Sequence, residues 1–173
     1  MRAIPTMSLD LDFELRLALF DHVRRLAPTG GETIAARTLN EGMVFRGERV
    51  PIWSQQKGIF RPAVLRDFGA ALTIQTSYDS PYDDHDDRVT NRVVYRYRGT
   101  DPSHPDNVAL RRAMELRRPL LYLVGIAPGV YKALFPWYVV GDRPDDLAFE
   151  LVTEAIGRDI PGGDEDPLVN IGL

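Results

Sequence analysis

The chain has 173 residues, 44% of them hydrophobic and 27% charged, with a formal net charge of −4, which suffices for one compact domain with its own core, or one domain with a short appendage. The lack of cysteine excludes a disulfide framework, a thiolate nucleophile and cysteine-rich zinc sites. Neither an apolar run of about eighteen residues nor a signal-peptide core is present, so we expect a cytoplasmic protein without a membrane span.

The first predicted element is a helix from Leu9 to Leu26. Its apolar residues fall in two rows at helical spacing: Leu9, Phe13, Leu17 and Phe20, and Leu15, Leu19, Val23 and Leu26. Acids load its first turns and bases its last, as the helix dipole favours: Asp10, Asp12, Glu14, Arg24 and Arg25. Two apolar rows predict burial against the rest of the domain, with a dimer contact as the alternative. Residues Thr33 to Asn40 predict a short second helix ending at Gly42.

Short extended runs separated by turns follow Gly42. Met43–Phe45 and Val50–Trp53 predict a hairpin around Arg46–Arg49. Further strands are predicted at Ala71–Thr76, Arg92–Arg98, Leu120–Ile126, Tyr131–Val140 and Leu147–Val152. One helix, Val108–Leu116, interrupts them, with Asp106 or Asn107 as its cap and Pro119 after its end. Six or so strands without regular βαβ alternation favour an α+β fold with a mixed or antiparallel barrel.

The net charge hides an uneven distribution along the chain. Residues 43–78 hold five basic side chains against two acidic ones, and residues 88–118 hold eight against three. Residues 79–87 hold five aspartates and no base, and residues 142–173 hold nine acids against two arginines. A basic centre is therefore masked by an acidic cluster and an acidic tail, which leaves nucleic-acid binding open beside an ordinary solvated surface.

The segment from Tyr78 to Arg98 combines aromatic, acidic and basic side chains. Strand alternation places Val93, Tyr95 and Tyr97 on one face and Arg92, Val94, Arg96 and Arg98 on the other. The preceding acidic loop, Tyr78 to Asp87, can fold back onto this strand through one turn. A flipped cytosine needs aromatic rings above and below it and a carboxylate that accepts from its amine. An ordinary core strand beside a solvated loop is the alternative interpretation.

Several short motifs occur here in the order found in one known family. They are Gly58-Ile-Phe-Arg-Pro62, Ala71-Leu-Thr-Ile, Tyr82-Asp-Asp-His-Asp86, Val94-Tyr-Arg-Tyr-Arg-Gly99 and Asn107 at a helix start. In this order the chain resembles the SRA (SET- and RING-associated) domain, over roughly residues 43–152. It is similar above all to the SRA-like N-terminal domain of bacterial modification-dependent endonucleases, through Ile52-Trp53, Ser80-Pro-Tyr-Asp83 and Pro119–Ile126 as well.

The resemblance implies a PUA/SRA-like twisted β-barrel with an N-terminal helix and one or two flanking helices. Residues 1–42 would form the N-terminal helical segment, residues 43–155 the base-reading barrel and residues 156–173 a linker-like acidic tail. It further implies that the chain binds double-stranded DNA, flips out a modified cytosine, with 5-methylcytosine the leading candidate, and targets an HNH endonuclease in type IV restriction.

The resemblance also assigns roles to particular residues. The base pocket would be formed by Tyr82, Asp83, Asp84, Tyr97, Tyr78 and Trp53. The groove wedge, next to the vacated base position, would be formed by Gln55, Gln56, Ile59, Phe60 and Arg61. Phosphates would be contacted by Lys57, Arg92, Arg96 and Arg98. No cofactor and no metal is expected at this site.

Two departures from the family pattern bear on function. The family's Tyr-Thr-Gly is Tyr97-Arg98-Gly99 here, so an arginine replaces a small hydroxyl near the base. His22, His85 and His104 cannot form a His-Asn-His nuclease motif, so we expect a reader that does not cut DNA. The chain end near Leu173 is accordingly expected to be a domain boundary within a longer endonuclease.

Two other functions compete with this one. A PUA-like module for RNA or modified nucleotides would stack bases on Tyr78, Tyr82 and Tyr97 without needing a duplex. A hydrolase would use the four aspartates Asp83, Asp84, Asp86 and Asp87 to hold Mg²⁺ or Ca²⁺. A reader that serves cleavage of both strands would work naturally as a homodimer.

Overall fold

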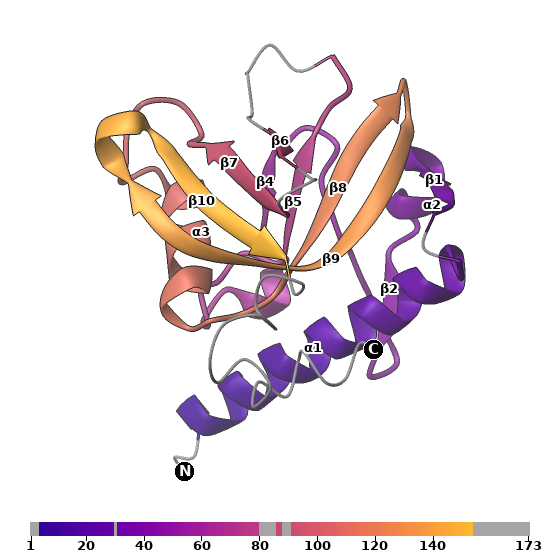
Figure 1. The fold of residues 1–173 in the computed structure, drawn as a ribbon. Helices are drawn as coiled ribbons and strands as arrows, with labels where there is room; N and C mark the ends of the chain where they lie inside the picture. Colours follow the sequence, from indigo (N-terminus) through magenta and orange to yellow (C-terminus); the bar gives the residue numbers. More distant parts are fainter. Residues whose placement is uncertain (1–3, 30, 80–85, 88–90, 154–173) are drawn as a thin grey trace.

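The computed structural model describes residues 4–29, 31–79, 86–87 and 91–153 (Figure 1). Its helices are α1 (Ile4–Leu26), α2 (Ala36–Asn40) and α3 (Pro105–Glu115), with 3₁₀ turns at Ala63–Leu65 and Pro144–Asp146. Its strands are β1 (Thr33–Ala35), β2 (Met43–Phe45), β3 (Glu48–Val50), β4 (Ile59–Phe60), β5 (Thr73–Thr76), β6 (Asp86–Asp87), β7 (Arg92–Arg96), β8 (Leu120–Ala127), β9 (Val130–Arg143) and β10 (Ala148–Thr153).

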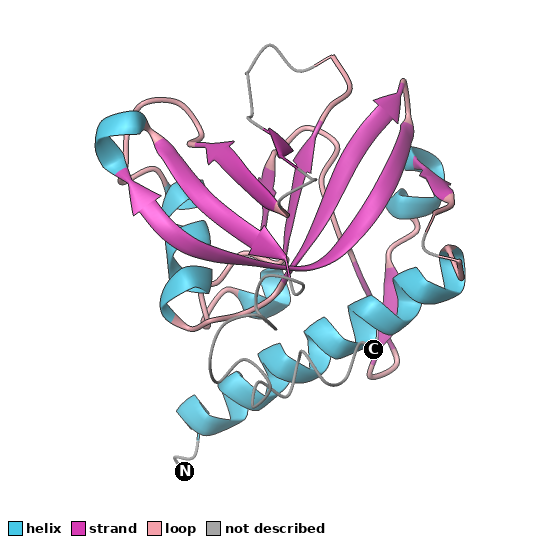
Figure 2. Cartoon of the chain, viewed as in Figure 1, coloured by secondary structure: helices cyan, strands magenta, loops and turns pink. Residues whose placement is uncertain are grey.

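The fold is α+β, with one strongly curved mixed sheet, as the sequence predicts. Its strand order is β4-β5-β8-β9-β10-β7-β6, and β1 adds to β9. Only the pairing of β5 with β8 is parallel among the described ladders; the others are antiparallel. Figure 2 shows the sheet curling so that its two arms rise on either side of a central trough. The separate hairpin β2–β3 turns through Arg46 and Gly47, both at positive φ, as a two-residue turn of type I′ requires.

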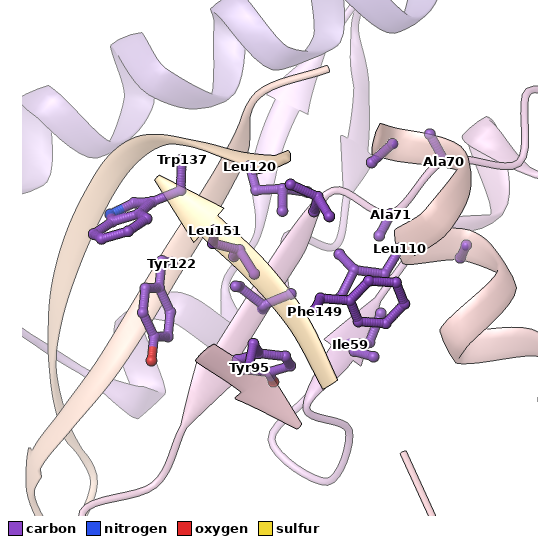
Figure 3. Packing of buried hydrophobic residues seen from close by; sticks show 14 of the residues in the cluster. Ile59, Ala70, Ala71, Tyr95, Leu110, Leu120, Tyr122, Trp137, Phe149 and Leu151 are labelled. Carbon is purple, nitrogen blue, oxygen red and sulfur yellow. The ribbon is translucent and has the colours of Figure 1, made fainter. Parts of the chain in front are cut away.

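Strand β8 separates two hydrophobic cores. Leu120, Tyr122 and Val124 point into the core on the concave side, which α3 closes, whereas Leu121 and Leu123 point into the core beneath α1. Strand β8 is therefore buried on both faces, which explains why its sequence is a continuous apolar run instead of an alternating one. Figure 3 shows the concave core around Tyr95, Tyr122, Trp137 and Phe149.

Helix α1 packs against the rest of the domain, as its two apolar rows predict. Its buried stripe includes Leu15, Leu19, Phe20 and Val23, which contact the same core as Leu121 and Leu123 of β8. The helix begins five residues earlier than predicted, at Ile4. Asp12 therefore lies in the middle of the helix rather than in its first turns, and it is fully buried.

Four details of the prediction differ from the structure. The second strand of the hairpin is Glu48–Val50 and its turn is Arg46–Gly47, so the predicted strand Val50–Trp53 and the turn over Arg46–Arg49 are wrong. The segment from Thr33 begins as strand β1, paired with Val130–Lys132 of β9, and becomes helical only at Ala36. Helix α3 is capped by His104, whose Nδ1 accepts from the backbone N–H of Asp106, and not by Asp106 or Asn107. The short strands β4 and β6 were not predicted, because two-residue strands carry no periodic signal.

The described helices include none that is long and apolar enough to span a bilayer. The predicted linker-like tail, residues 156–173, lies outside the described residues, and so do residues 80–85 of the acidic loop and residues 88–90 after it. Two of the four aspartates considered for metal binding, Asp83 and Asp84, fall in this undescribed part. In the remaining, described chain no group of three or more His, Cys, Asp or Glu side chains could hold a metal ion.

Candidate nucleic-acid interface

A tight turn from Ser54 to Gly58 presents polar side chains to solvent just before β4. The backbone N–H of Lys57 donates to the carbonyl of Ser54 over 3.3 Å, which closes the turn. Gln55, Gln56 and Lys57 at its tip are all exposed. Amide side chains can donate to and accept from base edges, and an ammonium group suits a phosphate.

This turn is held by residues of two other strands. The side-chain amide of Gln75 on β5 donates to the carbonyls of Ser54 (2.5 Å) and Lys57 (2.9 Å). The hydroxyl of Tyr95 on β7 lies between the carbonyls of Gly58 (2.9 Å) and Gln75 (2.8 Å). Because β7 belongs to the opposite arm of the sheet, the Tyr95 hydroxyl also joins the two arms across the concave side.

Gly58 is needed because the Tyr95 hydroxyl approaches it so closely. A Cβ at this position would lie 3.0 Å from that hydroxyl oxygen, closer than ordinary van der Waals contact. This explains the first residue of the Gly58-Ile-Phe-Arg-Pro62 motif: the glycine lets an aromatic hydroxyl reach the backbone of the turn.

Tyr78 is an exposed aromatic at the end of β5. Its side chain is 54% exposed, and it follows the last residue of the strand, Thr76, by two positions. Its backbone is packed against Gly125 of β8, where a Cβ would lie 2.6 Å from the Tyr78 nitrogen. Tyr78 and the Ser54–Gly58 turn thus lie at the same end of β5, and the predicted pocket role of Tyr78 is compatible with its exposure.

Strand β7 alternates as predicted. Val93, Tyr95 and Tyr97 are buried, whereas Arg92, Arg96 and Arg98 are exposed. Tyr97 is only 3% exposed and packs against Phe149 of β10, with ring centroids 4.8 Å apart. Tyr97 is therefore a core residue in this structure, and its ring is not open to a base as the resemblance implied.

The Tyr97 hydroxyl belongs to a polar cluster that sequence reasoning missed. It donates to Asp142 of β9, and Arg111 of α3 donates from Nε to the other carboxylate oxygen of Asp142 over 2.5 Å. Burial, reinforced by the hydrogen bond to Asp142, raises the pKa of Tyr97 above its ordinary value near 10. Burial alone would lower the pKa of Arg111, but its hydrogen bonds to Asp142 and Tyr97 outweigh burial and raise it.

Asn107 has a different role from the predicted cap. It is fully buried inside α3, where its side-chain carbonyl accepts from the Arg98 backbone N–H over 2.8 Å. Its amide donates to the backbone carbonyls of Arg98 (3.0 Å) and Asp101 (2.9 Å). The asparagine of the motif thus fixes the chain that leaves β7, including Gly99 at φ +65°.

The predicted phosphate contacts differ in their surroundings. Arg92 lies 3.3 Å from Glu150, and Arg98 lies 2.9 Å from Asp106. Arg96 is exposed, and so is Lys57, which has no ion-pair partner within the described residues. The same holds for Arg61, a predicted groove-wedge residue. In the part of the chain that the structure describes, no carboxylate pairs with Lys57 or Arg61, so both charges are available to a phosphate.

Two further predicted site residues are buried. Ile59 belongs to β4 and is 4% exposed within the concave core, so it does not project as a wedge; Phe60 beside it is half-buried. Trp53 is 5% exposed, meets Tyr131 edge-on and donates from its indole N–H to Asn40 over 2.8 Å. The exposed side chains of this region are instead those of Gln55 and Gln56 on the turn.

The other predicted pocket residues, Tyr82, Asp83 and Asp84, lie outside the described residues. The structure therefore brings Gln55, Gln56 and Lys57 together on one turn, with Tyr78 at the same end of β5. It places Tyr97 and Trp53 in the cores. Gln75, Asp142 and Arg111 were missed, because each acts through a partner far away in the sequence.

No protein-family model matches the chain, and no curated protein sequence matches it. Among solved structures, the chain is similar to the crystal structure of KRYPTONITE in complex with mCHG DNA and SAH, at 16% sequence identity and a TM-score of 0.38. The match covers 60% of this chain and 27% of that chain.

Proposed function

We propose that this chain binds double-stranded DNA and recognises a modified cytosine by flipping it out of the helix, with 5-methylcytosine as the first base to test. The observation that carries the proposal is the fixed turn at the end of β5, which presents Gln55, Gln56 and Lys57 to solvent. The order of motifs from Gly58 to Gly99, which resembles the SRA domain, supports the choice of base.

Each exposed group has a separate task in this proposal. The amides of Gln55 and Gln56 contact the base left unpaired by flipping, where glutamine can both donate and accept. Lys57 and Arg61 contact phosphates and set the register on the duplex. Tyr78 stacks on a base, and Tyr82, Asp83 and Asp84 complete the base pocket as the resemblance implies.

The test compares two duplexes that differ only in one central cytosine, 5-methylated or unmodified. We expect tighter binding to the modified duplex at two salt concentrations, measured by gel shift or fluorescence anisotropy. The double variant Gln55→Ala/Gln56→Ala should lose discrimination while keeping salt-sensitive binding, because phosphate contacts carry no sequence information. Equal affinities of the wild-type chain for the two duplexes would refute the proposal.

A second candidate function is binding of RNA or of a modified nucleotide. The observation that favours it is the 54% exposure of Tyr78, because a base can stack on an open ring without a duplex. Single-stranded RNA as a competitor separates the two candidates: displacement of duplex DNA at equal concentration favours RNA, and persistence of the DNA complex favours the reader.

The proposal assigns reading to this chain and cleavage to an HNH nuclease that it targets in restriction of modified DNA. Incubation of the chain with methylated plasmid and Mg²⁺ should leave the plasmid intact. A nicked or linear product would show that the chain itself is an enzyme. Sedimentation with and without duplex would show whether two copies assemble on one site, as cleavage of both strands would require.

A further inference from the structure

We propose that Gln75 is a positioning residue for DNA recognition: its side-chain amide holds the Ser54–Gly58 turn in the shape that presents Gln55 and Gln56. The inference rests on the proposed function, and it gives Gln75 a role that requires no contact with DNA.

Gln75 donates hydrogen bonds to most of the backbone carbonyl groups of the turn. Its side-chain nitrogen carries two N–H groups, and these donate to Ser54 and Lys57, the first and last residues of the closing hydrogen bond. Its backbone N–H donates to the carbonyl of Gly58 over 2.8 Å. One side chain on a strand of the sheet thus binds both ends of the hydrogen-bonded segment Ser54–Lys57 within the turn.

A turn held in this way suits recognition for a thermodynamic reason. A free turn of exposed polar residues would have to be ordered on binding, and that ordering would weaken the complex. Here the ordering has already occurred in folding, because Gln75 is fixed by the pairing of β5 with β4 and β8. Only the side chains of Gln55, Gln56 and Lys57 have to be ordered when DNA binds.

The strand offers a matched control at Thr73. Its hydroxyl donates to the backbone carbonyl of Ile52 over 2.7 Å, so it too joins β5 to the chain before β4. That bond lies ahead of the turn and touches none of its residues. Thr73→Val and Gln75→Met each remove side-chain donors from the same strand and preserve side-chain size, but only Gln75→Met releases the turn.

The experiment measures binding and backbone exchange in parallel for the wild type and the two variants. Gln75→Met should weaken binding to the 5-methylcytosine duplex about tenfold, because two hydrogen bonds no longer order the turn. Its ratio of affinities for modified and unmodified duplex should fall towards one. Thr73→Val should keep both values. Hydrogen exchange should be faster at the Lys57 amide in Gln75→Met only.

Three results overturn the inference. Wild-type affinity in Gln75→Met, equal weakening in Thr73→Val, or unchanged exchange at Lys57 would each show that Gln75 does not position the turn for DNA. If the wild type does not distinguish the two duplexes, the proposed function fails and the DNA role of Gln75 fails with it. The exchange measurement then decides separately whether Gln75 fixes the turn.

Discussion

At the scale of single residues, the buried hydroxyl of Tyr97 shows how a residue suited to stacking can serve packing instead. Its ring lies against Phe149, and its hydroxyl is engaged by Asp142 and Arg111. Alternation along β7 was sufficient to predict that Tyr97 faces inward. It could not reveal Asp142, which lies 45 residues away in the sequence. Asp142 comes close to Tyr97 because β7 and β9 both pair with β10 in the sheet.

The Tyr97 hydroxyl should make stability depend on alkaline pH. Tyr97→Phe should lower the free energy of unfolding by about 1–2 kcal/mol at pH 8, because a hydrogen bond to a carboxylate is lost. The raised pKa of Tyr97 means that this contribution is complete below the unfolded-state pKa near 10 and is lost as the pH rises through the folded-state pKa. The difference between wild type and variant should therefore shrink between pH 8 and about pH 11.

Urea unfolding of both proteins at the two pH values tests this. The pKa of Tyr131 is also raised by burial, but Tyr131 is present in both proteins, so its effect cancels in the difference. A gap between wild type and variant that stays constant would contradict the assignment.

Gly58 and Tyr95 should be energetically coupled. Gly58→Ala introduces a Cβ 3.0 Å from the Tyr95 hydroxyl, so it should destabilise the protein by about 1–3 kcal/mol. In a Tyr95→Phe background the hydroxyl is absent, and the same substitution should cost less. A double-mutant cycle on urea unfolding measures the coupling. Gly31→Ala is the control, because its Cβ would meet nothing within 4 Å. Equal costs in both backgrounds would contradict the close contact.

At the scale of elements, local patterns predicted individual elements better than their partners. Helix α1, the presence of a hairpin after Gly42 and the inward face of β7 follow from periodicity and turn chemistry, which act over a few residues, although the hairpin's second strand begins two residues earlier than predicted. The parallel pairing of β5 with β8 and the addition of β1 to β9 join distant segments, so no local pattern encodes them. The sequence also placed Asp10, Asp12 and Glu14 in the first turns of the helix, which is wrong. The helix starts at Ile4, before the apolar rows that defined its predicted beginning at Leu9.

The buried pair of Asp12 and Arg16 ties α1 to the sheet. Arg16 is fully buried, with Nε 2.7 Å from Asp12, and it also donates to the backbone carbonyls of Pro119 (2.6 Å) and Ala71 (2.8 Å). Those carbonyls precede β8 and β5, the two strands that pair in parallel. The spacing of four residues on the apolar stripe is the signal that could have predicted this pair.

Removing one member of this pair should be costly. Asp12→Ala leaves the Arg16 guanidinium buried without its carboxylate, so the free energy of unfolding should fall by about 3–5 kcal/mol. Asp21→Ala breaks the exposed pair with Arg24 on the same helix and should cost less than about 1 kcal/mol. Urea unfolding of the two variants provides the comparison. Equal costs would mean that the buried pair is no more important than a surface one.

At the scale of the whole molecule, the curved sheet has helix α1 on one side only (Figure 1). Strand β5 runs away from this helix (Figure 1), and its far end, Gln75 and Thr76, adjoins the Ser54–Gly58 turn and is followed by Tyr78. The net charge of −4 describes the chain as a whole, whereas binding at an interface depends on the charge at that place. Within the described residues, no carboxylate is paired with Lys57 or Arg61. DNA binding by an acidic chain is therefore physically reasonable.

This arrangement predicts which charges DNA should detect. Each phosphate contact releases counterions, so Lys57→Ala and Arg61→Ala should each reduce the slope of log affinity against log salt by about one. Arg25→Ala removes an equal charge from α1, on the opposite side of the sheet, and should leave the slope unchanged. Fluorescence anisotropy with an unmodified duplex across a salt series measures the slopes. If Arg25→Ala lowers the slope as much as Lys57→Ala does, DNA contacts a different face, and the turn at the end of β5 is not the interface.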